Sequence, residues 1–255
     1  MTDLNLFEAL HNCDTVEALH TATTEIVKQL GFEHFIYGVR VNISPVQPYQ
    51  FVFSGYPKEW RDHYSEAGYE NIDPTVQHCL IDRRVIPIVW EARTFSSRPA
   101  FQLLDEAKSC GLVNGASFPV QGSRGEAAML SVATSRNSNE AVEDMSAMMG
   151  KTQLLACYLH EAIQRIVLSK GPVPLGQVAL TKREKECLLW AAEGKTSWEI
   201  GSIINVSERT ITFHLQNAAH KMGVTNRQHA ISRALSLGLI TPLQNKTLFR
   251  FPDLP

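Results

Sequence analysis

The sequence has no long hydrophobic segment, no recognisable leader and no cysteine pattern of the kind that holds a metal or a disulfide framework. No apolar run among its 255 residues reaches the length of a transmembrane helix. The first residues lack the basic region of a secretory signal peptide. The five cysteines are odd in number and scattered, without CxxC pairs or zinc-spaced Cys/His clusters. These absences predict a cytoplasmic protein without a membrane partner, a structural metal or disulfides.

The chain also carries little charge. Charged residues make up 20% of the sequence, hydrophobic residues 44%, and the net charge is −2, which is typical of a globular protein. The length suits one large domain and one small domain. Basic side chains outnumber acidic ones between residues 180 and 240, whereas the rest of the chain is acidic. Such an asymmetry suits contact with nucleic acid by one end of the protein, although the excess by itself does not prove it.

Residues 180–240 contain three short helical patterns with helix-start signals. Thr181-Lys-Arg-Glu184 and Thr196-Ser-Trp-Glu199 match the capping box, and Ser207 is a good N-cap for the third helix. The inner face of that helix is apolar, at Ile211, Leu215, Ala218 and Met222. Its outer face carries Arg209, Thr212, Phe213, Gln216 and His220. A helix-turn-helix inserts such a face into the major groove of DNA; an ordinary surface helix is the alternative.

Two prolines and two glycines interrupt the chain at 169–176. Before them, residues 140–168 are predicted to form one long helix, whose apolar stripe covers the N-terminal core or serves a dimer. We therefore expect a first domain at 1–168, a linker at 169–179 and a second domain at 180–240. Residues 241–255 form a C-terminal extension of unknown role.

Residues 1–135 mix helical and strand periodicities. Helical patterns occur at 6–10, 16–30, 58–67, 75–81 and 100–110, and strand-like runs at 35–41, 50–54, 85–88, 116–121 and 128–134. Residues 121–125 are typical of a hairpin turn between the last two strands. This order predicts an α+β fold: an N-terminal α-β-α sandwich with an antiparallel sheet, followed by a small all-α helix-turn-helix domain.

Amphipathic aromatic residues gather beside one acidic residue in the N-terminal part. Tyr56, Trp60 and Tyr64 are spaced four apart, on one face of a helix and its leading turn. Such side chains suit a ligand that is partly apolar and partly polar. Asp73 precedes a proline and cannot continue a helix. Taken alone, Asp73 is typical of a helix N-cap and Trp60 of a core residue, so a ligand pocket and a plain core remain equally open.

Together these patterns resemble the LuxR family of quorum-sensing transcription factors over about residues 7–240. In the N-terminal part the resemblance is carried by Tyr56, Trp60, Tyr64, Asp73-Pro74, Trp90-Glu91, Gly111-Leu112 and Gly115. In the C-terminal part it is carried by Leu180-Thr-x-Arg-Glu184, Leu188, Gly194-Lys195, Ile200, Ser207-Glu-Arg-Thr210, His214 and Asn217. The resemblance implies an N-terminal domain that binds an N-acyl-homoserine lactone, with no cofactor, no metal and no catalytic residues.

The resemblance also implies a role for each polar residue of that site. Trp60 would donate its indole N–H to the lactone carbonyl, and ionised Asp73 would accept the acyl-amide N–H. Tyr56 and Ser131 would donate to the amide carbonyl. Such pairing is needed because a buried polar atom left without a partner costs about 1–3 kcal/mol.

The remaining ligand contacts would surround the ring and the acyl chain. Trp90 would wall the lactone ring, Ser117 would add a polar contact beside Ser131, and Arg61 would reach a 3-oxo group through water. We expect the acyl tail to lie against Gly38, Tyr64, Val76, Cys79, Leu112 and Ala128, with Ile36 and Leu103 as weaker candidates. The small residues at Gly38 and Ala128 favour a long acyl chain, since each buried methylene contributes about 0.8 kcal/mol. The resemblance adds the expectation of a 3-oxo group.

The implied mechanism is ligand-dependent activation of transcription. The ligand-bound protein would form a homodimer, place two recognition helices on a palindromic stretch of double-stranded promoter DNA and act with RNA polymerase. Thr212, Phe213 and Gln216 would face the bases. The expected phosphate contacts are Thr196, Arg209, Thr210, Asn217 and Lys221, and His220 completes the DNA-facing surface.

Other functional classes fit less well. A response regulator needs an acidic cluster near its N-terminus, where only the isolated Asp3 and Asp14 occur. A cysteine enzyme is disfavoured because adjacent residues such as His78 and Cys79 point about 100° apart on a helix. A ligand-independent regulator, or one that releases DNA when the ligand binds, remains open with the same architecture.

Overall fold

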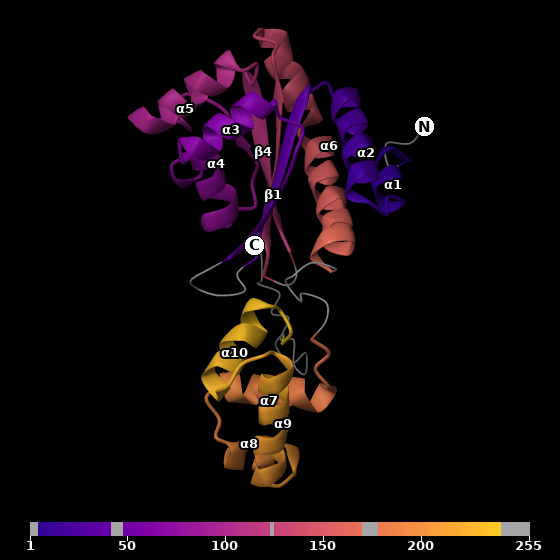
Figure 1. The fold of residues 1–255 in the computed structure, drawn as a ribbon, viewed down its shortest axis with the longest axis vertical. Helices are drawn as coiled ribbons and strands as arrows, with labels where there is room; N and C mark the ends of the chain where they lie inside the picture. The colour runs from indigo at the N-terminus through magenta and orange to yellow at the C-terminus, as the bar shows by residue number, and fades with distance from the viewer. Residues whose placement is uncertain (1–4, 42–47, 123–124, 170–177, 241–255) are drawn as a thin grey trace, which may run out of the picture. The chain divides into compact units, whose positions relative to one another are not determined.

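The computed structural model describes residues 5–41, 48–122, 125–169 and 178–240. The chain forms two compact units, residues 1–174 and residues 175–255, which Figure 1 draws with their helices and strands labelled. Most of the predicted linker and the whole predicted C-terminal extension lie outside the described residues. Each unit is treated by itself below.

The N-terminal unit is built on a five-stranded antiparallel sheet with the strand order β2-β1-β5-β4-β3. The strands are β1 (His34–Val41), β2 (Tyr49–Ser54), β3 (Ile88–Val89), β4 (Asn114–Gln121) and β5 (Ala127–Thr134). Four of them match the predicted runs closely. The third is shorter than the predicted 85–88, because Val85 and Ile86 are exposed, at 69% and 71%, and make no ladder. Between β4 and β5, the Gly122 N–H donates to the Glu126 carbonyl at 2.9 Å, and residues 123–124 of the predicted turn lie outside the described residues.

Helices cover both faces of this sheet, so the predicted α+β sandwich is confirmed (Figure 1). One face carries α1 (Asn5–His11), α2 (Val16–Gln29) and α6 (Asn139–Ile163), which continues into a π-helical turn, η3 (Gln164–Leu168). The other face carries α3 (Lys58–Glu66), η1 (Tyr69–Asn71), α4 (Pro74–Val76), η2 (Gln77–Ile81) and α5 (Arg98–Ser109). The predicted long helix at 140–168 corresponds to α6 with η3.

The period of two along each strand separates two sets of side chains. On β1, Tyr37 points toward α6, where its hydroxyl lies 2.6 Å from His160 Nδ1. Ile36 and Gly38 point to the opposite face, toward α3 and α5. Directly paired residues share a face, so the register places Ile36, Ser131 and Ser117 in one row on that side. We call this side of the sheet the α3–α5 face.

The C-terminal unit contains four helices among its described residues: α7 (Lys182–Ala192), α8 (Ser197–Ile204), α9 (Glu208–Lys221) and α10 (Arg227–Ser236). Both predicted capping boxes are formed, and Ser207 caps α9 by accepting the Thr210 N–H. The predicted inner face of α9 is buried. Gly201 is required for the approach of α8 to the following turn, since a Cβ there would lie 2.6 Å from the Val206 carbonyl oxygen.

The sequence analysis predicted three helices here and missed α10. This helix begins at an ordinary N-cap, in which the Asn226 side chain accepts the His229 N–H. Ala230 and Ala234 pack into the same core as α7 and α9. Two small residues make a weak apolar pattern, which explains the omission.

Among the described helices, none has the length and apolar character needed to cross a bilayer. In the same ranges, no group of three His, Cys, Asp or Glu side chains is arranged to hold a metal ion. All five cysteines are free thiols.

Candidate functional site

An aromatic wall lies on the α3–α5 face of the N-terminal unit. Trp60 on α3 is 3% exposed, and its ring centre lies 6.0 Å from Tyr64 and 6.3 Å from Tyr69. Tyr56 joins the same buried cluster from the turn before α3, and Leu112 joins it from beyond α5. The spacing predicted from the sequence therefore brings Tyr56, Trp60 and Tyr64 together.

Asp73 lies beside this wall, between η1 and α4. Its Oδ1 accepts the Thr75 N–H and the Thr75 hydroxyl, both at 2.7 Å, and its Oδ2 accepts the Tyr64 hydroxyl at 3.0 Å. Burial raises the pKa of Asp73, against the opposing effect of these hydrogen bonds. The carboxylate thus serves as the N-cap of α4, the role that its position before a proline suggested. The backbone N–H of Val76 also acts on this carboxylate to lower its pKa, so Asp73 is held by donors from α3 and α4.

One buried donor of the wall has no hydrogen-bond partner among the described residues. The Tyr56 hydroxyl is buried and makes no hydrogen bond. Burial, and then the charge of Asp73, raise the pKa of Tyr56 well above its usual value, so the group remains a proton donor. Because an unpaired buried hydroxyl costs about 1–3 kcal/mol, this arrangement is one that a ligand acceptor would stabilise.

Trp90, Ser117 and Ser131 form a hydrogen-bonded chain across β4 and β5. The Trp90 indole N–H donates to Ser117 Oγ at 3.0 Å, and the two serine oxygens lie 2.7 Å apart. An indole N–H can only donate, so Ser117 Oγ accepts from Trp90. The Ser117 hydroxyl can then donate to Ser131 Oγ, which leaves the Ser131 hydroxyl free to donate to another acceptor. Gly115 allows Trp90 to lie against β4, because a Cβ there would lie 2.6 Å from the Trp90 ring.

Several of the predicted tail contacts are apolar and buried on this side. Cys79 on η2 is fully buried, and burial together with the Asp73 charge raises its pKa to about 12, so it remains a neutral thiol. Val76 on α4 is half-buried. A Cβ added to Gly38 would meet no heavy atom within 4 Å, so the sheet has open space above this residue. Ile36 and Leu103, the weaker candidates, belong to the aromatic cluster.

The prediction that Ala128 lines the same space is wrong. Ala128 pairs with Val39 and Val120, so it lies on the opposite face, against the α6 side. Its neighbour Met129 pairs with Gly38 instead and is 6% exposed. A shift of one residue along a strand reverses the face of a side chain, and the sequence pattern did not establish the register.

Arg61 is the one predicted ligand residue on α3 that the structure places on the outside. It is exposed, whereas the neighbouring Trp60 is buried. Its predicted contact with a 3-oxo group has no geometric support from the described residues.

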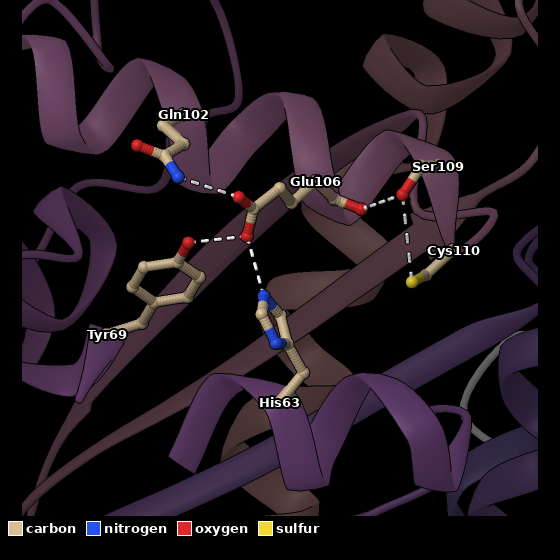
Figure 2. Close-up of polar contacts among 6 residues, drawn as sticks. All are labelled: His63, Tyr69, Gln102, Glu106, Ser109 and Cys110. Carbon is tan, nitrogen blue, oxygen red and sulfur yellow. Dashed lines mark hydrogen bonds and ion pairs between the residues drawn. The ribbon is translucent and has the colours of Figure 1, made fainter. Parts of the chain in front are cut away.

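The sequence analysis missed a polar cluster that joins the outer elements of this layer (Figure 2). Glu106 Oε2 on α5 accepts from His63 Nε2 on α3 at 2.7 Å and from the Tyr69 hydroxyl on η1 at 2.5 Å. Its Oε1 accepts from Gln102 Nε2, on the same helix, at 2.8 Å. Tyr69 lies in the aromatic run of the sequence, but its partner is 37 residues away, so local spacing contained no signal for the pair.

The C-terminal unit presents the outer face of α9 to solvent. Arg209, Thr212, Phe213 and Gln216 line one hollow together with Glu208. Phe213 is 59% exposed, and its ring centre lies 5.9 Å from that of the neighbouring His214. Thr210 and Asn217 are half-buried, and the Thr210 hydroxyl bonds to Ser207 Oγ at 2.8 Å. Thr196 and His220 are exposed, although the Thr196 hydroxyl also bonds to Glu199 at 2.9 Å.

Lys221 has an internal partner that the sequence analysis did not anticipate. Its Nζ lies 2.8 Å from Glu184 Oε2 and 3.3 Å from the Ala179 carbonyl oxygen. Burial acts to raise the pKa of Glu184, but the hydrogen bonds from Lys221 and Thr181 lower it overall. The pair ties α9 to α7, and this tie competes with the phosphate contact predicted for Lys221.

Comparisons with known proteins agree with both units. Residues 15–163 match the autoinducer binding domain, and residues 178–234 match the luxR family of bacterial regulatory proteins. The chain is 37% identical over 214 residues to the transcriptional activator VanR of Vibrio anguillarum, covering 84% of this chain and 87% of VanR. It is 36% identical over 222 residues to the transcriptional activator AnoR of Acinetobacter nosocomialis, covering 85% and 91%.

Among solved structures, the fold is similar to that of Escherichia coli SdiA. The TM-score is 0.76 at 24% identity, over 94% of this chain and 98% of SdiA. The relatives are transcriptional activators and not enzymes. The chain therefore belongs to the LuxR family of transcriptional regulators, with an autoinducer-binding domain followed by a helix-turn-helix DNA-binding domain.

Proposed function

We propose that the autoinducer of this protein is a long-chain N-acyl-homoserine lactone, bound on the α3–α5 face of the N-terminal domain (residues 1–168). The observation that carries the proposal is the buried Tyr56 hydroxyl, a donor without a hydrogen-bond partner that lies close enough to the Asp73 carboxylate for its charge to raise the pKa of Tyr56. A lactone head group with an amide supplies both a carbonyl acceptor and an N–H donor.

Each polar atom of the head group then has a partner. Asp73 accepts the amide N–H, while Tyr56 and Ser131 donate to the amide carbonyl. Trp60 donates to the lactone carbonyl. Trp90 walls the ring and is oriented by its bond to Ser117. These donors are buried, and hydrogen bonds in buried surroundings discriminate strongly between matching and non-matching ligands.

The acyl chain lies over the open space at Gly38, with Tyr64, Val76, Cys79, Leu112 and Met129 as its apolar surroundings. Met129 replaces Ala128 in this set for the reason of register given above. Methionine is flexible and adapts to irregular spaces, so this side chain is the natural candidate to adjust the length of chain that fits. The proposal does not include a contact between Arg61 and a 3-oxo substituent, since Arg61 is exposed.

In the DNA-binding domain (residues 180–240), α9 acts as the recognition helix of a homodimer on palindromic promoter DNA. Thr212, Phe213 and Gln216 face the bases, where Phe213 suits a thymine methyl group. The phosphate contacts come from Arg209, Thr210, Asn217 and the start of α8 at Thr196, with His220 at the edge of the surface. Bound in this way, the dimer recruits RNA polymerase and activates transcription.

Thermal unfolding of the purified protein tests the ligand class. Saturated and 3-oxo N-acyl-homoserine lactones from butanoyl to tetradecanoyl are added one at a time. A ligand at a hundredfold its Kd stabilises the folded state by about 2.7 kcal/mol, so the midpoint should rise and should peak at one chain length. Folded protein whose midpoint moves with none of the series would contradict the proposal.

A promoter-reporter assay tests the direction of regulation. We expect expression to rise with the lactone that gives the largest midpoint shift. A fall in expression with the same lactone would indicate a regulator that the ligand releases from DNA, and expression that ignores it would indicate ligand-independent binding.

A further inference from the structure

The cluster around Glu106 joins the elements that carry the proposed head-group site. Glu106 on α5 holds His63 of α3 and Tyr69 of η1 with the same carboxylate oxygen, at 2.7 and 2.5 Å (Figure 2). We call these three residues the Glu106 clasp. A carboxylate oxygen only accepts, so both partners donate. The clasp therefore ties three elements together across a sequence separation of about 40 residues.

The clasp is charged near neutral pH. The hydrogen bond from Tyr69, followed by those from Gln102 and His63, lowers the pKa of Glu106 to about 2. The same bond is the main cause that raises the pKa of Tyr69 to about 12. An ionised carboxylate and a protonated phenol make a hydrogen bond that is shorter and stronger than one between neutral groups.

Tyr69 connects the clasp to the ligand residues. Its ring centre lies 6.3 Å from Trp60 and 5.9 Å from Tyr64, and its backbone carbonyl accepts the Asp73 N–H at 2.9 Å. Its side chain is 7% exposed. A change in the position of Tyr69 would therefore move the indole donor, the tyrosine that bonds to Asp73 and the backbone of Asp73 itself.

We propose that Glu106 is a positioning residue for ligand binding, which acts through Tyr69 and His63 to hold Trp60, Tyr64 and Asp73 in the geometry that accepts the head group. The inference rests on the proposed lactone site. Glu106 itself belongs to the outer side of the wall and is not assigned to the ligand. Preorganisation of this kind raises affinity because the ordering cost is met before the ligand arrives.

The chain offers a matched control for the test. Gln102 bonds to the same carboxylate, but both residues lie on α5, so that bond ties no elements together. We compare Tyr69→Phe, which removes only the hydroxyl, and Glu106→Ala with Gln102→Ala. Each variant and the wild type are examined for the ligand-free unfolding midpoint and, at a temperature well below it, for the Kd of the series from butanoyl to tetradecanoyl homoserine lactones.

Tyr69→Phe and Glu106→Ala should each raise the Kd of the best wild-type ligand roughly tenfold, as expected for a lost hydrogen bond to a charged group. Gln102→Ala should leave the Kd unchanged. A purely structural role would lower the ligand-free midpoint and leave the Kd of the folded protein at the wild-type value, which would overturn the inference. An equal loss of affinity in Gln102→Ala would also overturn it. If the wild type binds the lactone and the clasp variants bind it equally well, the positioning role is refuted and the proposed function is unaffected. If the wild type binds no lactone, the proposed function is refuted as well.

Discussion

Replacing Asp73 by asparagine should move ligand affinity and protein stability in different directions. The carboxylate has a raised pKa because burial opposes its charge. A group whose folded pKa lies above its unfolded value lowers stability at pH values above the folded pKa, and this loss disappears as the pH falls toward the unfolded pKa. Asparagine is uncharged and is an equally good N-cap. The ligand-free unfolding midpoint of Asp73→Asn at neutral pH should therefore equal or exceed that of the wild type.

Ligand affinity should fall in the same variant. The asparagine oxygen can still accept from Thr75, which places its NH2 group where Oδ2 now lies. An N–H of the ligand would then meet a donor. The loss of a hydrogen bond to a charged group is about 1.5–3 kcal/mol, which corresponds to roughly a tenfold to hundredfold rise in Kd. Isothermal titration of the two proteins with the same lactone measures the change.

Thr75→Val provides the control, since it removes the Thr75 hydroxyl from Oδ1 and keeps the Thr75 N–H in the cap. It should change the lactone Kd much less than Asp73→Asn does. If Asp73→Asn binds the lactone as tightly as the wild type, Asp73 is only the N-cap of α4 and the head-group assignment fails.

Three further predictions concern the tail, the DNA-binding domain and the DNA contacts. In Met129→Ala, the lactone that gives the largest rise in unfolding midpoint should have a longer acyl chain than in the wild type. Ala128→Val should lower the free energy of unfolding by about 1–3 kcal/mol through overpacking and leave the preferred chain length unchanged. A change of preferred length in Ala128→Val would contradict the register of β5. Lys221→Ala should lower the free energy of unfolding of the DNA-binding domain by about 1–2 kcal/mol at neutral pH. That difference in unfolding free energy should shrink as the pH falls through the lowered pKa of Glu184. An unchanged unfolding free energy would mean that the Lys221–Glu184 pair does not stabilise the domain and that Lys221 is available for a phosphate contact. Arg209→Ala should reduce the slope of log K against log salt by about one without changing the preferred DNA sequence, and a changed preference would place Arg209 on a base.

Local signals in the sequence were sufficient for much of the C-terminal domain. The capping boxes at Thr181 and Thr196 involve residues three positions apart, and the apolar stripe of α9 repeats within a single helix. These interactions form within a few residues, so their chemistry can be read directly from the sequence. The helix α10 was missed because its buried face consists mainly of alanines, which leave little hydrophobic contrast.

The sheet illustrates the limit of that reasoning. Strand periodicity located β1, β2, β4 and β5 to within a few residues, but it did not determine whether Ala128 or Met129 faces the site. The face depends on the pairing of β5 with β1 and β4. Every position of β5 is buried, and small or apolar residues fill most of them, so the alternation of apolar and polar residues that usually fixes register was absent.

By itself, the sequence determined the order of the strands and of most helices, the two domains' classes and the aromatic and acidic residues that resemble an autoinducer site. Only the tertiary structure decided how those residues are used. It left the Tyr56 hydroxyl without a partner, engaged Asp73 as an N-cap with Tyr64, and joined Lys221 to Glu184. It also brought Glu106 to Tyr69 from 37 residues away. The physical reason is that capping and periodicity act over a few residues, whereas ion pairs, unpaired donors and strand register depend on segments that meet only when the chain folds.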